Sequence, residues 1–245
     1  MNTKLTFIII LILVVLAGAG FYIYKDFTSI DRSSTSINNN EERPEGTASI
    51  SPVTEVKEDP ANGKSAAAPD LSKITITSAE IEKIKKLIVI NPIYYEAWLE
   101  LGILLKNAGD YANAAEAWKY AAILRPTEYV PHHNLGDLYR FYVKNYPEAE
   151  SHWLRSVSIQ PDFLQGYTNL SDLYRYSYKE KSSEAPKILL DGLAKNPNNL
   201  FLFGYLANYY EEMGDKDNAR KYYGDILKID PKNSTALDAL ARLSN

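Results

Sequence analysis

The distribution of apolar and polar residues divides the chain into three parts. Residues 5–24 contain no charged side chain and lie between Lys4 and Lys25. Residues 25–70 are rich in Ser, Thr, Asn, Glu and Pro, and they show no sustained apolar period. From residue 71 onward, apolar positions recur at the three- and four-residue spacing of amphipathic helices. The pattern therefore predicts an apolar N-terminal helix, a disordered polar linker and a helical domain.

The apolar segment at 5–24 predicts a transmembrane helix that follows a short tail of residues 1–4. An α-helix needs about 20 apolar residues to cross the hydrocarbon core of a bilayer. A cleaved signal peptide is the alternative, because Ala17-Gly18-Ala19 resembles a small-x-small cleavage site. We favour an uncleaved anchor because the apolar run continues beyond this site to Tyr24.

The orientation of this segment follows from the charges beside it. The N-terminal tail carries Lys4 and the free amine, whereas the basic residues on the other side are diluted by acidic ones. A short basic tail before a first helix favours the cytoplasm. We therefore expect a single-pass membrane protein with its N-terminus inside and its helical domain on the extracytoplasmic side.

Five prolines punctuate the rest of the chain at a nearly constant interval. Pro92, Pro126, Pro161, Pro197 and Pro231 are separated by 34, 35, 36 and 34 residues. A period near 34 residues indicates a repeat architecture. The windows share aromatic, leucine, small-residue and alanine positions, which in the first window are Trp98, Leu101, Gly102, Ala114, Trp118 and Ala121. The second window contains one additional residue, and the third contains two.

These windows resemble the tetratricopeptide repeat (TPR), a pair of antiparallel helices that stacks on its neighbours. The resemblance implies an all-α fold, a right-handed α-solenoid of tandem helical hairpins. Its domain would span residues 71–245, with ten helices in all. We expect a half-repeat helix at 78–90, repeats at about 95–128, 129–163, 164–199 and 200–233, and a C-terminal capping helix at 234–243.

Small residues and glycines mark two local features of this architecture, the close contacts between paired helices and the turns that end the first helix of a repeat. Gly102 and Gly136 occupy the position where the two helices of a repeat approach each other closely. Gly109 and Gly214 each precede an aspartate and are expected to end the first helix of their repeats. Residues 77–80, Thr-Ser-Ala-Glu, resemble a capping box at the start of the half-repeat helix.

The TPR resemblance also implies a binding surface. In this family the first helix of each repeat lines a concave groove that takes peptides. The candidate peptide-binding residues are Leu99, Ile103, Lys106 and Asn107 in the first repeat, His133, Asp137, Arg140 and Phe141 in the second, Thr168, Asp172, Arg175 and Tyr176 in the third, and Asn208 and Glu211 in the fourth.

The second and third repeats share an Asp-x-x-Arg pattern followed by an aromatic residue. Asp137 and Arg140, like Asp172 and Arg175, stand three residues apart on one helix face. Either each pair neutralises itself, or the strip hydrogen-bonds the backbone of a ligand. Members of this family that clamp the C-terminal carboxylate of chaperones need Lys and Asn at two positions of the first repeat. In this chain Leu99 and Ile103 occupy these positions, so the carboxylate clamp is absent in this register. These two residues instead favour an apolar ligand or packing against the helix at 78–90.

Several other functions are disfavoured by composition. The chain has no cysteine, and no nucleotide-binding, hydrolase or metalloprotease motif is present. By the repeat register, His132, His133 and His152 do not share a face, so we predict no metal site, no cofactor and no enzyme activity. The net charge of -4 argues against nucleic-acid binding. Most tyrosines fall on repeat packing positions, and Tyr142, Tyr176 and Tyr178 are expected to be exposed.

The favoured function is a membrane-tethered scaffold that binds a partner protein or peptide in its groove, in cell-envelope assembly or secretion. The alternative is an anchored or secreted accessory subunit that binds a glycan or a cell-wall ligand. The exposed tyrosines are candidates for partner contact, because tyrosine is enriched at protein interfaces.

Overall fold

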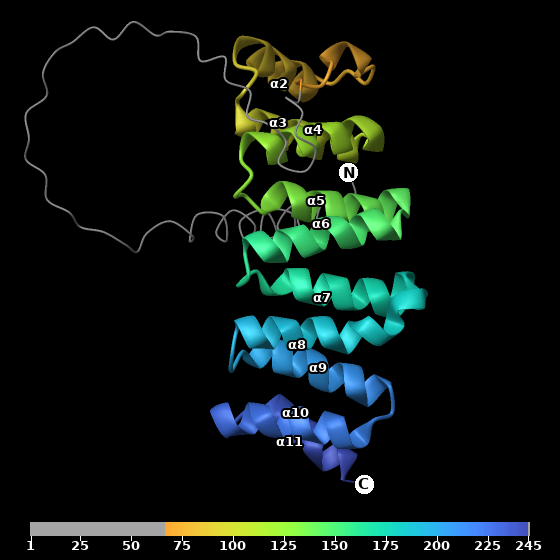
Figure 1. Cartoon of the computed structure of the whole chain (residues 1–245), viewed down its shortest axis with the longest axis vertical. Helices are drawn as coiled ribbons and strands as arrows, with labels where there is room; N and C mark the ends of the chain where they lie inside the picture. Colours follow the sequence, from red (N-terminus) through yellow and green to blue (C-terminus); the bar gives the residue numbers. More distant parts are fainter. Residues whose placement is uncertain (1–66, 245) are drawn as a thin grey trace, which may run out of the picture. The chain divides into compact units, whose positions relative to one another are not determined.

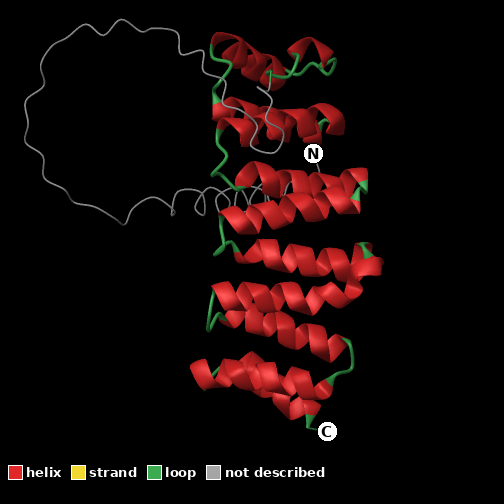
Figure 2. Ribbon diagram, viewed as in Figure 1, coloured by secondary structure: helices red, strands yellow, loops and turns green. Residues whose placement is uncertain are grey.

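The computed structural model describes residues 67–244, which form a stack of antiparallel helices (Figure 1). Every regular element in this range is helical, which confirms the all-α prediction for the described residues (Figure 2). The transmembrane helix predicted at 5–24 lies outside them, and so does most of the predicted linker. Between residues 67 and 244, no helix has both the length and the apolar character that a membrane crossing requires.

Ten α-helices make up this stack, as the repeat pattern predicts. They are α2 (Ala79–Ile90), α3 (Tyr95–Asn107), α4 (Tyr111–Leu124), α5 (Val130–Asp137), α6 (Tyr146–Ile159), α7 (Leu164–Asp172), α8 (Ala185–Lys195), α9 (Leu200–Glu212), α10 (Lys216–Ile229) and α11 (Ser234–Leu243). The pairs α3–α4, α5–α6, α7–α8 and α9–α10 are the four hairpins. Helix α2 packs on α3 at one end, and α11 packs on α10 at the other (Figure 1).

The additional residues of the second and third repeats lie at the ends of their first helices. Helix α5 continues into the π-helix η2 (Leu138–Val143), and α7 continues into the π-helix η3 (Leu173–Ser177). Each wide turn closes on a long-span hydrogen bond, from the amide of Asn145 to Tyr139 O (2.9 Å) and from that of Tyr178 to Leu173 O (2.7 Å). A π turn holds one residue more than an α turn. The third repeat also has a 3-10 segment, η4 (Lys179–Glu184).

The glycines between paired helices allow the close approach that the sequence predicts. A Cβ atom on Gly102 would lie 2.3 Å from Nε1 of Trp118, and one on Gly136 would lie 2.3 Å from Cδ1 of Trp153. Both tryptophans are fully buried. The indole of the second helix therefore lies flat against the backbone of the first, where any side chain would displace it.

The predicted glycine turns are confirmed, and the predicted capping box is wrong by one residue. Gly109 and Gly214 have φ angles of +85° and +76°. In the second repeat Lys144 takes the same left-handed conformation at φ +62°. Helix α2 begins after Ser78, whose hydroxyl accepts from the amide of Ile81, so Glu80 does not occupy the third helical position.

The buried apolar residues form two clusters. One extends from Ile74 to Leu138, and the other extends from Ala149 to Leu243. Tyr139 is partly buried and packs against both. The two clusters therefore meet inside the second repeat, where α5 and α6 carry histidines among otherwise apolar packing positions.

Candidate peptide-binding groove

Two arginines dominate the polar strip on the first helices of the second and third repeats. Arg140 lies in η2 and Arg175 lies in η3, so the π turns position both side chains. Each guanidinium lies over the next ring of its own segment, Phe141 at 4.8 Å and Tyr176 at 4.7 Å from the ring centroid. Both rings are otherwise exposed. The strip thus presents two arginine–aromatic pairs, one on each repeat.

Arg140 is a buried cation with weak partners. It is 9% exposed, yet its Nε lies 3.4 Å from Ser177 Oγ and its Nη1 lies 3.5 Å from the Asn169 carbonyl oxygen. Both distances are at the outer limit for a hydrogen bond. Within the described part of the chain, no carboxylate oxygen lies within 4.0 Å of it. Burial lowers the pKa of Arg140, and the charge of Asp172 opposes that effect.

Arg175 is bound to a different repeat. Its side chain is 7% exposed, and Nη2 forms an ion pair with Glu212 at the end of α9. The hydroxyl of Tyr176 donates to the same carboxylate at 3.2 Å. Neither arginine pairs with the aspartate three residues before it. The expectation that the Asp-x-x-Arg pairs neutralise themselves is therefore wrong, because each arginine extends across to the following repeat.

Buried polar atoms without partners gather along the same strip. His133 Nδ1, Asp137 Oδ1, Asp172 Oδ1 and Arg175 Nε are buried and have no hydrogen-bond partner within 3.5 Å, although the Trp153 indole lies near Asp137 and the Tyr205 hydroxyl near Asp172. Nε2 of His133 lies 3.7 Å from Oδ2 of Asp137, and burial lowers the pKa of His133 and raises that of Asp137. A buried polar group without a partner costs about 1–3 kcal/mol. The strip therefore contains buried donors and acceptors that the fold itself leaves unpaired.

The candidate residues of the outer repeats differ in their availability to a ligand. Leu99 packs against the N-terminal apolar cluster, whereas Ile103 and Asn107 are exposed. Lys106 lies 5.8 Å from the ring centroid of Tyr142. In the fourth repeat, Glu211 binds Arg242 of α11 at 2.7 Å.

Internal hydrogen bonds occupy two further candidates. The hydroxyl of Tyr223 donates to Asn208 at 2.5 Å and to Glu211 at 2.9 Å. Thr168 in the third repeat is buried and donates to the carbonyl of Gln165 at 3.1 Å. The exposed candidate side chains are Ile103 and Asn107 in the first repeat, Phe141 in the second, Tyr176 in the third and Asn208 in the fourth.

One contact was missed by the sequence register. Nδ1 of His132 on α5 lies 3.1 Å from Nδ1 of His152 on α6, and the ring of Tyr139 stacks on His152 at 5.6 Å. Burial lowers the pKa of both histidines to about 4. The register separates these residues because it treats each helix alone, whereas the antiparallel hairpin brings their faces together. In residues 67–244, no three His, Asp or Glu side chains form a metal-binding group.

Two of the three tyrosines that the sequence predicts to be exposed are exposed, and Tyr94 is exposed without having been predicted. Tyr142 and Tyr176 are exposed. Tyr178 packs against the C-terminal apolar cluster and lies 6.4 Å from the ring of Tyr146, so the prediction that it is exposed is wrong. The 3-10 segment η4 turns the chain back at this point and covers its ring.

Comparison with known families gives a match at the C-terminal end of the stack. Residues 200–243 match the sequence model of the tetratricopeptide repeat family. This segment contains the last hairpin and the capping helix α11. No curated protein matches the chain.

Solved tetratricopeptide structures resemble the described stack. The C-terminal part of a TPR protein from Cytophaga hutchinsonii has a TM-score of 0.50 and 22% identity, covering 65% of each chain. This likeness supports the same fold for the repeats that precede residue 200. MamA has a TM-score of 0.49 and 21% identity, covering 63% of this chain and 89% of its own. PilF of Pseudomonas aeruginosa has a TM-score of 0.48 and 19% identity, covering 67% and 75%.

Proposed function

We propose that this protein is a membrane-tethered scaffold that binds a partner protein or peptide along the first helices of its second and third repeats. The TPR fold is a scaffold without catalytic groups of its own, and stacked helical pairs present extended binding surfaces. The single observation that carries the proposal is the polar strip from His133 to Tyr176, where buried donors and acceptors lack partners.

The chemistry of the strip favours a peptide backbone. Arg140 offers N–H groups, and Asp137 and Asp172 offer acceptor oxygens one repeat apart. An extended peptide presents alternating carbonyl and amide groups that match such a series. A glycan would stack on open aromatic faces. The rings of Phe141 and Tyr176 each have one face covered by an arginine, so the strip favours protein over sugar.

A photo-crosslinking experiment tests this site. A photoreactive amino acid at Phe141 or Tyr176 should capture a protein partner, whereas one at the exposed Leu154 on α6 should not. The double variant Arg140→Met/Asp172→Asn should lower capture at least tenfold. Lys195→Met/Asp217→Asn makes the same charge changes at exposed positions elsewhere and should leave capture unchanged. Equal capture by both double variants would refute the proposed site.

The tether is proposed from the apolar segment at 5–24. Deletion of residues 5–24 should release the chain from carbonate-washed membranes, and retention would contradict the anchor. The absence of native cysteine allows the sidedness to be measured separately. A single cysteine at the exposed Leu237 should react with a membrane-impermeant maleimide in intact cells if the repeats lie outside the cytoplasm.

The tether would raise the local concentration of the groove at the membrane, which strengthens binding to partners confined there without new contacts. A role in envelope assembly or secretion follows from this placement. Partners captured from the outer side in the crosslinking experiment would support it, and exclusively cytosolic partners would contradict it.

A further inference from the structure

The N-terminal end of the stack carries the most exposed apolar side chains of the described residues. Val89 is 71% exposed and Ile90 is 80% exposed, at the last turn of α2. Leu87 near the end of α2 and Ile93 and Tyr94 in the turn before α3 are also exposed. These five residues, called here the α2 tip, lie together in sequence and at one end of the solenoid (Figure 1).

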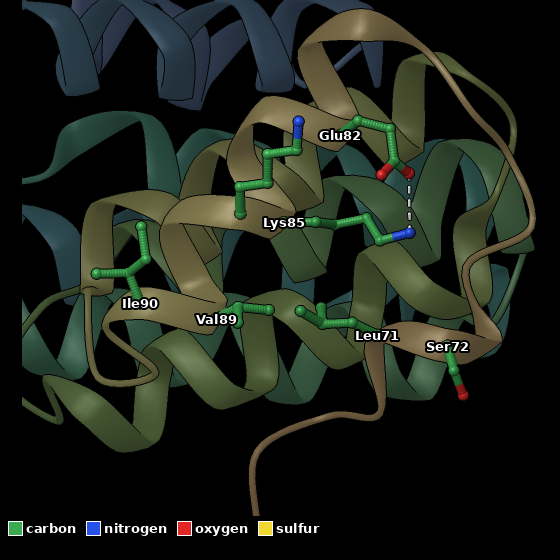
Figure 3. Close-up of a pocket in the computed structure, with 7 residues that line it drawn as sticks. Leu71, Ser72, Glu82, Lys85, Val89 and Ile90 are labelled. Atoms are coloured by element: carbon green, nitrogen blue, oxygen red, sulfur yellow. Dashed lines mark hydrogen bonds and ion pairs between the residues drawn. The ribbon is translucent and has the colours of Figure 1, made fainter.

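Helix α2 leaves this surface uncovered because it is half of a repeat. Its inward stripe of Ile81, Ile84 and Ile88 is buried against the first hairpin. The short helix η1 (Leu71–Lys73) covers only part of the outward side. An open pocket of about 490 Å³ lies between η1 and α2 (Figure 3), and it is lined by Leu71, Ser72, Glu82, Lys85, Lys86, Val89 and Ile90.

The charges around the tip are positive. Lys83 and Lys86 are exposed and lie opposite the buried isoleucines on the helical wheel. Lys85 is bound to Glu82 at 2.9 Å, as the dashed line in Figure 3 shows. Helix α2 carries three lysines and two glutamates, Glu80 and Glu82, so it is positive by one charge, although the protein as a whole is acidic.

We propose that the α2 tip docks on an anionic lipid surface. Exposed apolar residues beside lysines are the composition of interfacial helices, whose apolar side chains enter the headgroup region while lysines contact anionic lipids. The described stack begins at this end, so any membrane segment earlier in the chain is attached at the docking side. A second copy fits less well, because two α2 helices packed together would oppose their lysines.

This docking deepens the proposed tether but does not depend on it, because the lipid contact is made by the folded repeats. Docking of the α2 tip would fix the orientation of the stack relative to the membrane. The groove of the second and third repeats would then stay at a fixed distance from the membrane, facing along its surface or away from it.

Single-cysteine labelling of the full chain tests the docking, since the native chain has no cysteine. Ile90→Cys carries an environment-sensitive fluorophore, and Leu237→Cys on α11 is the control at the opposite end. The chain is added to vesicles of phosphatidylcholine alone or with 30% phosphatidylglycerol. We expect the probe at position 90 to brighten at least twofold and to be quenched by nitroxide lipids only with phosphatidylglycerol, while the probe at 237 does not change.

Charge variants complete the test. Lys83→Glu/Lys86→Glu should reduce the response at position 90 to the level in phosphatidylcholine, since each lysine near an anionic surface strengthens binding about fivefold. Lys144→Glu/Lys216→Glu changes the same charge at exposed sites on other repeats and should retain it. Equal responses in both kinds of vesicle, or a probe that is shielded from a water-soluble quencher before vesicles are added, would overturn the docking.

A probe that is shielded before vesicles are added would mean that residues 1–66 or a second copy of the chain cover the α2 tip. Dilution of the sample distinguishes these two cases, because it would uncover the tip only if a second copy covers it. Failure of the proposed anchor is a separate result. In that case deletion of residues 5–24 would not change membrane retention, whereas the probe at position 90 would still report lipid contact.

Discussion

Replacing Arg140 by methionine separates a binding residue from a structural one. Methionine keeps an unbranched side chain of similar length and removes the charge. If Arg140 is held for a ligand, Arg140→Met should weaken partner capture while leaving the stability of the stack nearly unchanged. A residue retained for stability would show the opposite behaviour, because removing it would lower the free energy of unfolding.

The magnitude follows from the contacts of Arg140. Burying an ion costs several kcal/mol after relaxation, and only good partners recover that cost. Its two hydrogen bonds, at 3.4 and 3.5 Å, are long. Its contacts with the rings of Phe141 and Trp153, at 4.8 and 5.8 Å, are each worth about 0.5–2 kcal/mol. We therefore expect the free energy of unfolding to change by less than about 1 kcal/mol, or to rise.

A contrasting position on the same stack calibrates this expectation. Glu150 on α6 accepts from Lys181 Nζ at 2.6 Å and from the hydroxyl of Tyr174 at 2.7 Å, and its side chain is 13% exposed. Glu150→Leu leaves both donors without their acceptor and should cost about 2–4 kcal/mol. This change breaks a link between the second and third repeats without touching the candidate strip.

Urea unfolding followed by tryptophan fluorescence measures both variants. All three tryptophans, Trp98, Trp118 and Trp153, are buried in the repeats, so the signal reports this part of the chain. A loss above about 2 kcal/mol for Arg140→Met would refute the reasoning, since it would show that the guanidinium is satisfied within the fold.

Three further predictions concern packing, turns and pH. Gly102→Ala should cost about 1–3 kcal/mol, because its Cβ would lie 2.3 Å from Nε1 of Trp118; a smaller loss in urea unfolding would show that the indole can shift. Gly109→Ala meets open space but keeps φ at +85°, so it should cost only about 1 kcal/mol in the same assay. The pKa values of His132 and His152 are near 4, below the ordinary 6.5, so the unfolded chain binds more protons between these values. Stability should therefore fall by on the order of 2 kcal/mol as the pH drops from about 6.5 to 4, after allowance for partial exposure, and an unchanged pH profile in His132→Asn/His152→Asn would contradict this assignment.

Local chemistry in the sequence accounts for most of the fold. Proline spacing, small residues and helix-spaced apolar positions carry the tetratricopeptide resemblance, which implies ten helices, and the structure contains ten in its described range. These signals are local because helix ends, glycine turns and the face of each helix depend on near neighbours in the chain. The roles of Gly102, Gly109 and Gly214 follow from their places in the repeat pattern alone.

Only the tertiary structure decided how the polar strip is connected. The Asp-x-x-Arg spacing suggests pairs within one helix, whereas Arg140 contacts Asn169 and Ser177, and Arg175 binds Glu212. The same holds for His132 and His152, which meet across a hairpin. The additional residues in the second and third repeats are visible in the proline spacing, but their π turns are not. The partner of a long side chain depends on the distance between stacked helices. The number of residues between two positions in the sequence does not give that distance.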